Sequence, residues 1–286
     1  MNIQGNTLKD LQMDYYLAGL IEGDGNIWTQ KTIRSTKGRV NNLQIMFTFD
    51  KEEKPLYRCI QVIFGTGSFY DIKSTNACRY TISEKHSLIK IINLINGKFR
   101  TPKIEYLYKA IDYINIVHNT NIKKLPLDNS NLLSNPWLIG ITDSDGNFNI
   151  SLCGTYGLTG SACKRRVICS FTLKQRMIDK STNLSCVPFM TELADLFKCK
   201  VNYKGENEIV FVVQANSKHP LVKSYFDKFP LMSSKYLNYL CYLKGLDYLG
   251  RRLTVKEIIE IQAIKNSMNN KRTYYNWDHL NNFYKL

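Results

Sequence analysis

The sequence predicts an α+β fold, built as a pseudo-twofold tandem repeat of two αββαββα units. A nine-residue pattern occurs twice, as LAGLIEGDG from Leu17 to Gly25 and as LIGITDSDG from Leu138 to Gly146. The hydrophobic spacing after each copy runs through the same order of helices and strands. A second pair of similar segments, KHSLIK at 85–90 and KHPLVK at 218–223, indicates a diverged duplication and not a solenoid.

Each copy of the pattern is expected to form a short helix. Asp14 is the expected N-cap of the first helix, and Asn135 that of the second, with Pro136 at the first helical position. Each helix ends in Asp-Gly, and Gly25 and Gly146 are expected to take the left-handed conformation that ends many helices.

Small residues recur four apart on one face of each helix. Gly19 and Gly23 share a face of the first helix, and Gly140 and Ser144 share one of the second. Small side chains at this spacing let two helix backbones approach closely, so we expect a central two-helix interface. The alternative is a helix pair with acidic ends and no chemistry.

Such an interface would bring Asp24 and Asp145 side by side at the C-terminal ends of the two helices. Both ends carry unsatisfied carbonyls and a negative dipole, so the two carboxylates repel each other. A divalent cation such as Mg²⁺ would offset this repulsion, because it prefers hard oxygen ligands.

The remaining elements follow from alternating and helical spacing. In the first unit we expect strands at 26–34 and 41–49, a helix at 52–64, strands at 67–73 and 77–83, and helices at 84–95 and 102–117. In the second we expect strands at 147–153 and 165–174, a helix at 186–197, strands at 199–204 and 207–214, and helices at 218–228 and 233–248. An extra helix is expected at 254–269.

The predicted domain organisation is an N-terminal repeat at 1–117, a polar linker at 118–134, and a C-terminal repeat with its extra helix at 135–286. The chain is strongly basic, with 39 Lys and Arg against 24 Asp and Glu and a net charge of +15. Such a balance favours a polyanionic partner. No apolar run approaches the ~18 residues of a membrane-spanning helix, so no membrane partner is expected. The eight scattered cysteines are expected to be thiols.

The paired motifs resemble the LAGLIDADG homing endonucleases, specifically the single-chain, double-motif kind, over residues from about 14 to 250. The resemblance implies two antiparallel β-saddles over DNA, and cleavage of both strands at a long, nearly asymmetric site with 3′ overhangs. It implies that Asp24 and Asp145 bind Mg²⁺, helped by the carbonyls of Gly23 and Ser144. Mn²⁺ is expected to substitute, and Ca²⁺ to bind without turnover.

The resemblance also implies that each half contributes a basic residue that orders water near the scissile bonds. We expect these to be Lys103 and Lys235, with Arg100 as a rival for the first. Many relatives carry Gly or Ala at the position of Ser144, which is therefore expected to loosen the helix packing.

A glutamine often accompanies the basic residue. Gln175 fits this role in the second half, and its first-half equivalent is expected at Asp50 or Lys51, so the two sites are expected to differ. Glu22 and Asp143, two residues before the metal carboxylates, are expected to cap or to pair with basic residues across the interface.

The open face of each sheet is expected to contact base edges in the major groove, which admits a β-ribbon. In the first half this face is predicted to carry Trp28, Gln30, Thr32, Arg34, Asn42, Gln44, Met46, Thr48, Ser68, Tyr70, Arg79 and Thr81. In the second half it is predicted to carry Asn149, Ser151, Arg166, Ile168, Ser170 and Thr172. Gln44, Arg34, Arg79 and Arg166 are the best candidates to read bases. The alternative is an ordinary solvated face, and an error of one residue in register would exchange the faces.

The expected function is that of a monomeric, intron-encoded homing endonuclease acting on double-stranded DNA. The alternatives are an intron RNA maturase, which would bind its own intron RNA on the same fold, and a DNA-binding regulator without cleavage. Retention of Asp24 and Asp145 favours the nuclease. The N-terminus resembles no presequence, and the composition is rich in Asn, Lys and Tyr, which together indicate an organelle-encoded protein, in the mitochondrion of a fungus for example.

Overall fold

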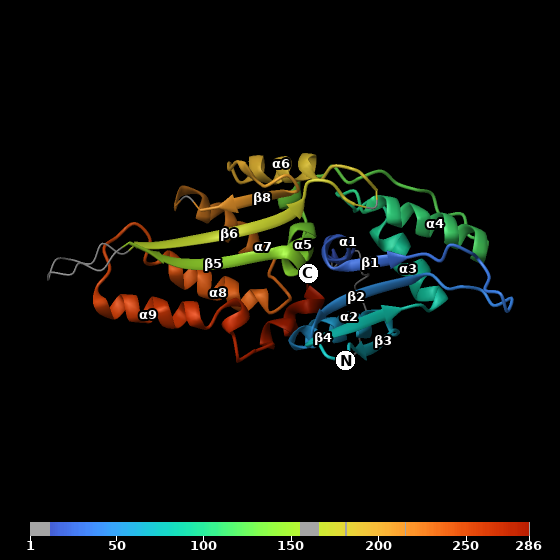
Figure 1. Ribbon diagram of the computed structural model, residues 1–286, viewed down its shortest axis with the longest axis horizontal. Coiled ribbons are helices and arrows are strands. Elements are labelled where there is room, and N and C mark those ends of the chain that lie inside the picture. Colours follow the sequence, from blue (N-terminus) through green and yellow to red (C-terminus); the bar gives the residue numbers. More distant parts are fainter. Residues whose placement is uncertain (1–11, 155–165, 181, 215, 286) are drawn as a thin grey trace.

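The computed structural model describes residues 12–154, 166–180, 182–214 and 216–285. Two similar halves lie along the long axis of the molecule, and helices α1 (Met13–Gly23) and α5 (Trp137–Asp145) pack together at its centre (Figure 1). The predicted α+β fold with two repeats and a central helix pair is confirmed.

The first half continues from α1 with elements in nearly the predicted order. They are β1 (Gly25–Trp28), β2 (Gln44–Asp50), α2 (Lys54–Phe64), β3 (Ser68–Asp71), β4 (Ala77–Ile82), α3 (Lys85–Ile95) and α4 (Ile104–His118). The four strands form one antiparallel sheet in the order β1-β2-β4-β3.

The second half repeats this arrangement. Its elements are β5 (Gly146–Cys153), β6 (Arg166–Arg176), α6 (Val187–Leu196), β7 (Val201–Lys204), β8 (Glu208–Val213), α7 (His219–Lys228) and α8 (Lys235–Leu246). The sheet order is β5-β6-β8-β7, the same topology as in the first half. The expected extra helix is α9 (Val255–Asn266), and the chain then returns to the middle of the molecule (Figure 1).

One face of each sheet is buried against helices, because apolar residues alternate along the strands. In the first sheet, Phe47 and Tyr80 are buried, and the ring of Phe49 stacks on Tyr57 of α2 with centroids 3.7 Å apart. In the second sheet, Phe148 and Phe171 stack on each other under α7 and α8. Each such side chain contributes about 1.5–3 kcal/mol through burial. The opposite faces stay open.

The predicted strand at 26–34 is wrong beyond Trp28. Residues 29–43 have no regular strand, apart from a single bridge between Arg34 and Val40. The segment folds back on itself through backbone hydrogen bonds from Asn41 to Ile33 at 2.9 Å and from Ser35 to Arg39 at 2.8 Å. The Asn41 side chain adds a bond to the carbonyl oxygen of Thr32 at 2.8 Å.

The predicted starts of the two motif helices need correction. Helix α1 begins at Met13, so Asp14 lies inside its first turn and pairs with Lys98 at 3.5 Å. Helix α5 begins at Trp137, although the Asn135 side chain does accept from the Trp137 N–H at 3.0 Å, as a cap does.

The glycines after the two motif helices are not left-handed. Gly146 has φ −73° and ψ 154°, and Gly25 is absent from the positive-φ residues of the described chain. They are glycines because each strand starts against the preceding helix. A Cβ on Gly25 would lie 2.5 Å from the Cα of Ile21, and one on Gly146 would lie 2.5 Å from the Thr142 side chain.

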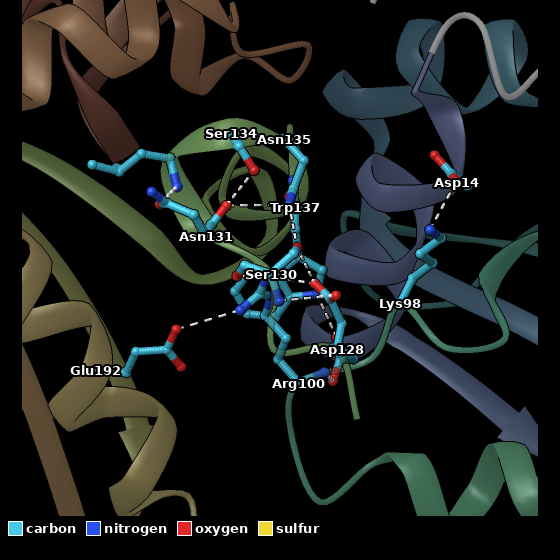
Figure 2. A network of polar contacts seen from close by, with 12 residues as sticks. Asp14, Lys98, Arg100, Asp128, Ser130, Asn131, Ser134, Asn135, Trp137 and Glu192 are labelled. Carbon is cyan, nitrogen blue, oxygen red and sulfur yellow. Dashed lines mark hydrogen bonds and ion pairs between the residues drawn. The ribbon is translucent and has the colours of Figure 1, made fainter. Parts of the chain in front are cut away.

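The segment 120–131, inside the predicted linker, forms no regular helix or strand and is held by a buried arginine (Figure 2). The Arg100 side chain, only 2% exposed, pairs with Asp128 and donates to the carbonyl oxygen of Ser130 at 2.5 Å. It also reaches Glu192 of α6 at 3.4 Å and lies over the ring of Trp137. This side chain therefore connects the linker to both halves.

The cysteines of the described residues are free thiols, as expected, and burial raises the pKa of the Cys169 thiol to about 12. Among the helices of the described ranges, none combines the length and the apolar character that crossing a membrane requires.

Candidate functional site

Small residues bring the two central helices into backbone contact. A Cβ placed on Gly19 would lie 2.1 Å from the carbonyl oxygen of Trp137, and one on Gly140 would lie 2.1 Å from that of Tyr16. Real Cβ atoms do not approach backbone this closely, so only glycine fits at either position. The predicted close approach is confirmed.

Ser144 does not loosen this packing, contrary to expectation. It lies opposite Gly23, where a Cβ on the glycine would meet the Ser144 Cβ at 2.1 Å. Its hydroxyl donates to the carbonyl oxygens of Gly140 at 3.0 Å and of Leu20, on the other helix, at 3.3 Å. The serine fills the space that Gly23 leaves and links the two helices.

The acidic residues at the ends of the two helices lie close together. The Asp145 carboxylate comes within 3.5 Å of where a Gly23 Cβ would be. Asp24 reaches solvent, but it lines a hollow between the halves with Glu53, Asp143 and Lys235. Loss of water there, together with the charge of Asp145, raises the pKa of Asp24 to about 6 against the opposing charge of Lys235.

Lys103 and Lys235 occupy equivalent places at the ends of the two motif helices. The Lys103 ammonium donates to the carbonyl oxygens of Gly23 at 2.6 Å and of Gly25 at 3.1 Å. The Lys235 ammonium donates to the carbonyl oxygens of Thr142 at 3.2 Å and of Ser144. Burial lowers the pKa of each lysine.

Arg100, the rival of Lys103, is not placed for the same role. Its guanidinium is buried in the linker network described above, away from solvent (Figure 2). Of these two neighbouring basic residues, Lys103 therefore lies beside the acids and Arg100 anchors the linker.

The donor set at the helix ends suits a hard divalent cation. Two carboxylates, Asp24 and Asp145, adjoin the carbonyls of Gly23 and Ser144, and all four donors are oxygens. No cluster of three or more His, Cys, Asp or Glu that could hold a metal occurs among the residues whose placement is described. Mg²⁺ often binds one or two carboxylates and completes its shell with water and phosphate oxygens, so two carboxylates are enough. The carbonyl oxygens of Gly23 and Ser144 would bind the cation while they also accept from Lys103 and Lys235.

The two helix ends differ at the glutamine position. Gln175 donates to the Asp145 carboxylate at 2.7 Å. The ladders pair Gly146 with Leu173 and Gly25 with Phe47, so the first-half equivalent of Gln175 is Phe49. The expectation of Asp50 or Lys51 was wrong by one or two residues, and Phe49 is buried against Tyr57. The predicted difference between the two sites is therefore present.

Glu22 and Asp143 are buried behind the carboxylates, at 3% and 6% exposure. They cap backbone N–H groups, as one expectation had it, and neither forms an ion pair within the described part of the chain. Burial raises the pKa of Glu22 to about 7 and raises that of Asp143.

The open face of the first sheet carries the side chains that alternation predicts. The ladders place Trp28 beside Gln44, Met46 beside Thr81, and Thr48 beside Arg79. Six of the predicted residues line one hollow of about 480 Å³: Gln44, Met46, Ser68, Tyr70, Arg79 and Thr81. Four others lie outside the sheet, in the irregular segment 29–43: Gln30, Thr32, Arg34 and Asn42. Of these, Arg34 donates to the carbonyl oxygen of Gly38 at 2.8 Å.

The open face of the second sheet likewise holds the predicted residues. The ladder pairs Asn149 with Ser170 and Ser151 with Ile168, and Arg166 and Thr172 have the same orientation. The same alternation adds residues that sequence reasoning missed: Asn26, Asn147, Lys174 and Arg176. Asn26, Asn147 and Lys174 lie inside the predicted strands, so alternation alone could have found them, and Arg176 lies two positions beyond the predicted end of its strand.

A family model described as LAGLIDADG endonuclease matches residues 17–115 and 138–246. An intron-encoded DNA endonuclease of Saccharomyces cerevisiae, aI3, is 29% identical over 99% of this chain and 77% of its own. A cox1 intron-2 protein of Schizosaccharomyces pombe is 28% identical over 83% of this chain and 66% of its own. The intron-encoded RNA maturase bI4 of Saccharomyces cerevisiae is 32% identical over 51% of this chain and 20% of its own.

Solved structures share the fold. The LAGLIDADG meganuclease I-AabMI bound to uncleaved DNA has a TM-score of 0.69 and 21% identity, and the match covers 90% of this chain and 99% of that one. I-SmaMI, bound to an uncleaved DNA target in the presence of calcium ions, has a TM-score of 0.64 and 19% identity, covering 90% and 98%.

Proposed function

The chain belongs to the LAGLIDADG endonuclease family, and from this premise we propose that it is a monomeric homing endonuclease that cuts both strands of one long, nearly asymmetric DNA site. One observation carries the proposal: a single chain presents two carboxylates, Asp24 and Asp145, between two open polar sheets. The repeat at 1–117, the linker and the repeat at 135–286 would act as one unit, because both acids lie in one chain.

DNA would lie across the two open faces, with the helix ends at the middle of the bound site. The amide of the half-buried Gln44 and the exposed guanidinium groups of Arg79 and Arg166 can bond base edges bidentately. The two faces carry different side chains, which supports an asymmetric target. The net charge of +15 would supply affinity for phosphates and a steep dependence on salt.

Cleavage of a phosphodiester needs an activated water and neutralisation of the charge on the phosphate. Asp24 and Asp145 would hold divalent cations there, Mg²⁺ in the cell with Mn²⁺ as a substitute, and the bound cation supplies both functions. Ca²⁺ would support binding without turnover.

The residues of the chain would prepare the site. The ammonium groups of Lys103 and Lys235 are fixed by the helix carbonyls beside the acids, where they can stabilise negative charge on the phosphate and order water. Gln175 would fix the orientation of the Asp145 carboxylate through its hydrogen bond. The resulting ends would be 3′ overhangs.

The setting would be an intron of an organelle genome, most simply a mitochondrial one. Relatives whose names include intron-encoded and cox1 intron support this origin. A maturase that binds its intron RNA is not favoured, because RNA binding alone does not need both carboxylates.

The experiment is cleavage of a pool of long DNA sites by the purified protein with Mg²⁺, followed by sequencing of the product ends. We expect linear products from one sequence, with 3′ overhangs. Failure to cut any site, together with tight binding to structured intron RNA, would refute the proposal in favour of the maturase.

A further inference from the structure

Two buried carboxylates remain outside the chemistry described above. Glu22 and Asp143 each lie two residues before a metal-binding acid, on a different side of the same helix. Glu22 is hydrogen-bonded to the loop that precedes α4, and Asp143 to the loop that precedes α8. Lys103 lies at the end of the first loop, and Lys235, the first residue of α8, directly follows the second.

In the first half the contacts form a closed ring. The Glu22 carboxylate accepts from the N–H groups of Arg100 at 2.8 Å and of Thr101 at 2.6 Å. The Thr101 hydroxyl accepts from the N–H of Lys103 at 3.3 Å. The Lys103 ammonium then returns to the carbonyl oxygen of Gly23, the residue next to Glu22.

The second half forms the same ring from different residues. The Asp143 carboxylate accepts from the N–H of Met232 at 2.9 Å, and from the N–H and the hydroxyl of Ser233 at 3.1 and 2.6 Å. The Ser233 oxygen accepts from the N–H of Lys235 at 3.1 Å. The Lys235 ammonium returns to the carbonyl oxygen of Ser144, next to Asp143.

Each carboxylate also binds an aromatic side chain of the opposite motif helix. The indole N–H of Trp137 donates to Glu22 at 2.6 Å, and the hydroxyl of Tyr16 donates to Asp143 at 3.1 Å. These two bonds tie each carboxylate to the opposite helix and are not part of the ring that holds the lysine.

We propose that Glu22 and Asp143 are positioning residues, each of which fixes the lysine of its own half relative to the metal-binding carboxylates. This inference rests on the proposed endonuclease function. A carboxylate suits the task because it accepts from three or four donors at once, whereas an amide has only one acceptor oxygen. Glutamate in one half and aspartate in the other reach equivalent loops. The two halves therefore share the ring of contacts and not the side-chain length.

The test uses the full chain and its target DNA with Mg²⁺, with a different fluorophore on the 5′ end of each strand. Initial nicking rates are measured for the two strands separately, for Glu22→Gln, Asp143→Asn, Lys103→Met and Lys235→Met. A simple loss of folded protein would slow both strands equally. Loss of positioning in one half changes the ratio of the two rates.

We expect Glu22→Gln to slow the strand that Lys103→Met slows, and Asp143→Asn to slow the strand that Lys235→Met slows. The ratio should change by on the order of tenfold, since displacement of a catalytic group by about 1 Å can cost 100-fold. The matched control is Tyr16→Phe, which removes the hydrogen bond from the opposite helix and leaves the ring of contacts around Asp143 in place, so it should keep the ratio near its wild-type value.

A wild-type ratio in Glu22→Gln or Asp143→Asn, or a bias toward the strand opposite to that of the matching lysine variant, would overturn the proposal. If either acid variant fails to fold, Thr101→Val and Ser233→Ala decide, because each removes one link of a ring and leaves the carboxylate in place. They should show the same biases, and an unchanged ratio would overturn the proposal equally. A wild-type protein that cuts neither strand refutes the proposed function, and this inference with it.

Discussion

Addition of one methyl group to α1 at the central interface should destabilise the protein. Removal of the facing side chain from α5 should restore the stability. A Cβ on Gly23 would lie 2.1 Å from the Ser144 Cβ and 2.3 Å from its hydroxyl oxygen, about 1.3 Å short of the 3.4 Å at which ordinary contact begins. Overpacking of this kind costs about 1–3 kcal/mol. We therefore expect Gly23→Ala to lower the free energy of unfolding by that amount.

The double variant Gly23→Ala with Ser144→Gly should recover this loss. It removes both clashing atoms, and the next neighbour of the new Cβ is the Asp145 carboxylate at 3.5 Å, an ordinary contact. Its stability should lie within about 1 kcal/mol of Ser144→Gly alone, which loses a little through the added helix glycine.

The assay is chemical denaturation of the four proteins of the cycle, with linear extrapolation to water. Gly19→Ala is the matched control, because its Cβ would meet the backbone oxygen of Trp137, which no side-chain change removes. Ser144→Gly should not restore that variant. A double variant as unstable as Gly23→Ala, or a Gly23→Ala without cost, would refute the reasoning.

Three further predictions follow from the sheet, the linker and the acids. Gln44→Ala and Arg79→Ala should each lose about 1–3 kcal/mol of discrimination at one base pair, measured by Ca²⁺-supported binding to single-base variants of the target; equal weakening on all variants would contradict base reading. Arg100→Met should lower the free energy of unfolding by about 3–5 kcal/mol, because it strands Asp128 in the buried linker network, and a loss below about 1 kcal/mol would contradict this. Asp24, whose pKa is raised to about 6, must lose its proton before it binds a cation, so Ca²⁺ affinity of the DNA complex should fall as pH drops below about 6, and in Asp24→Asn this step should vanish.

Much of the fold could be predicted because the motif is local and repeated. Alternation in β2 placed Gln44, Met46 and Thr48 on one face, and the ladder confirms that register. Prediction failed for the strand beyond Trp28, where the chain leaves the sheet and folds back on itself in a loop held by a few backbone bonds and the Asn41 side chain.

The site was predictable where spacing within one helix decided it, and less so where distant segments meet. Asp24 and Asp145 follow from the motif, but the equivalence of Gln175 with Phe49 depends on strand pairing across two hairpins whose connections differ in length. The burial of Arg100 depends on a linker residue 28 positions away. No local pattern in the sequence encodes the strand pairing of the hairpins or the burial of Arg100.

The central claim is that two carboxylates on adjoining helix ends hold the cations that cut DNA. The most direct measurement is Mg²⁺-dependent cleavage of the identified target by the wild type, Asp24→Asn and Asp145→Asn, beside Ca²⁺-supported binding by the same proteins. We expect linear product from the wild type alone, and binding by all three. Cutting of both strands at the wild-type rate by either variant would contradict the account.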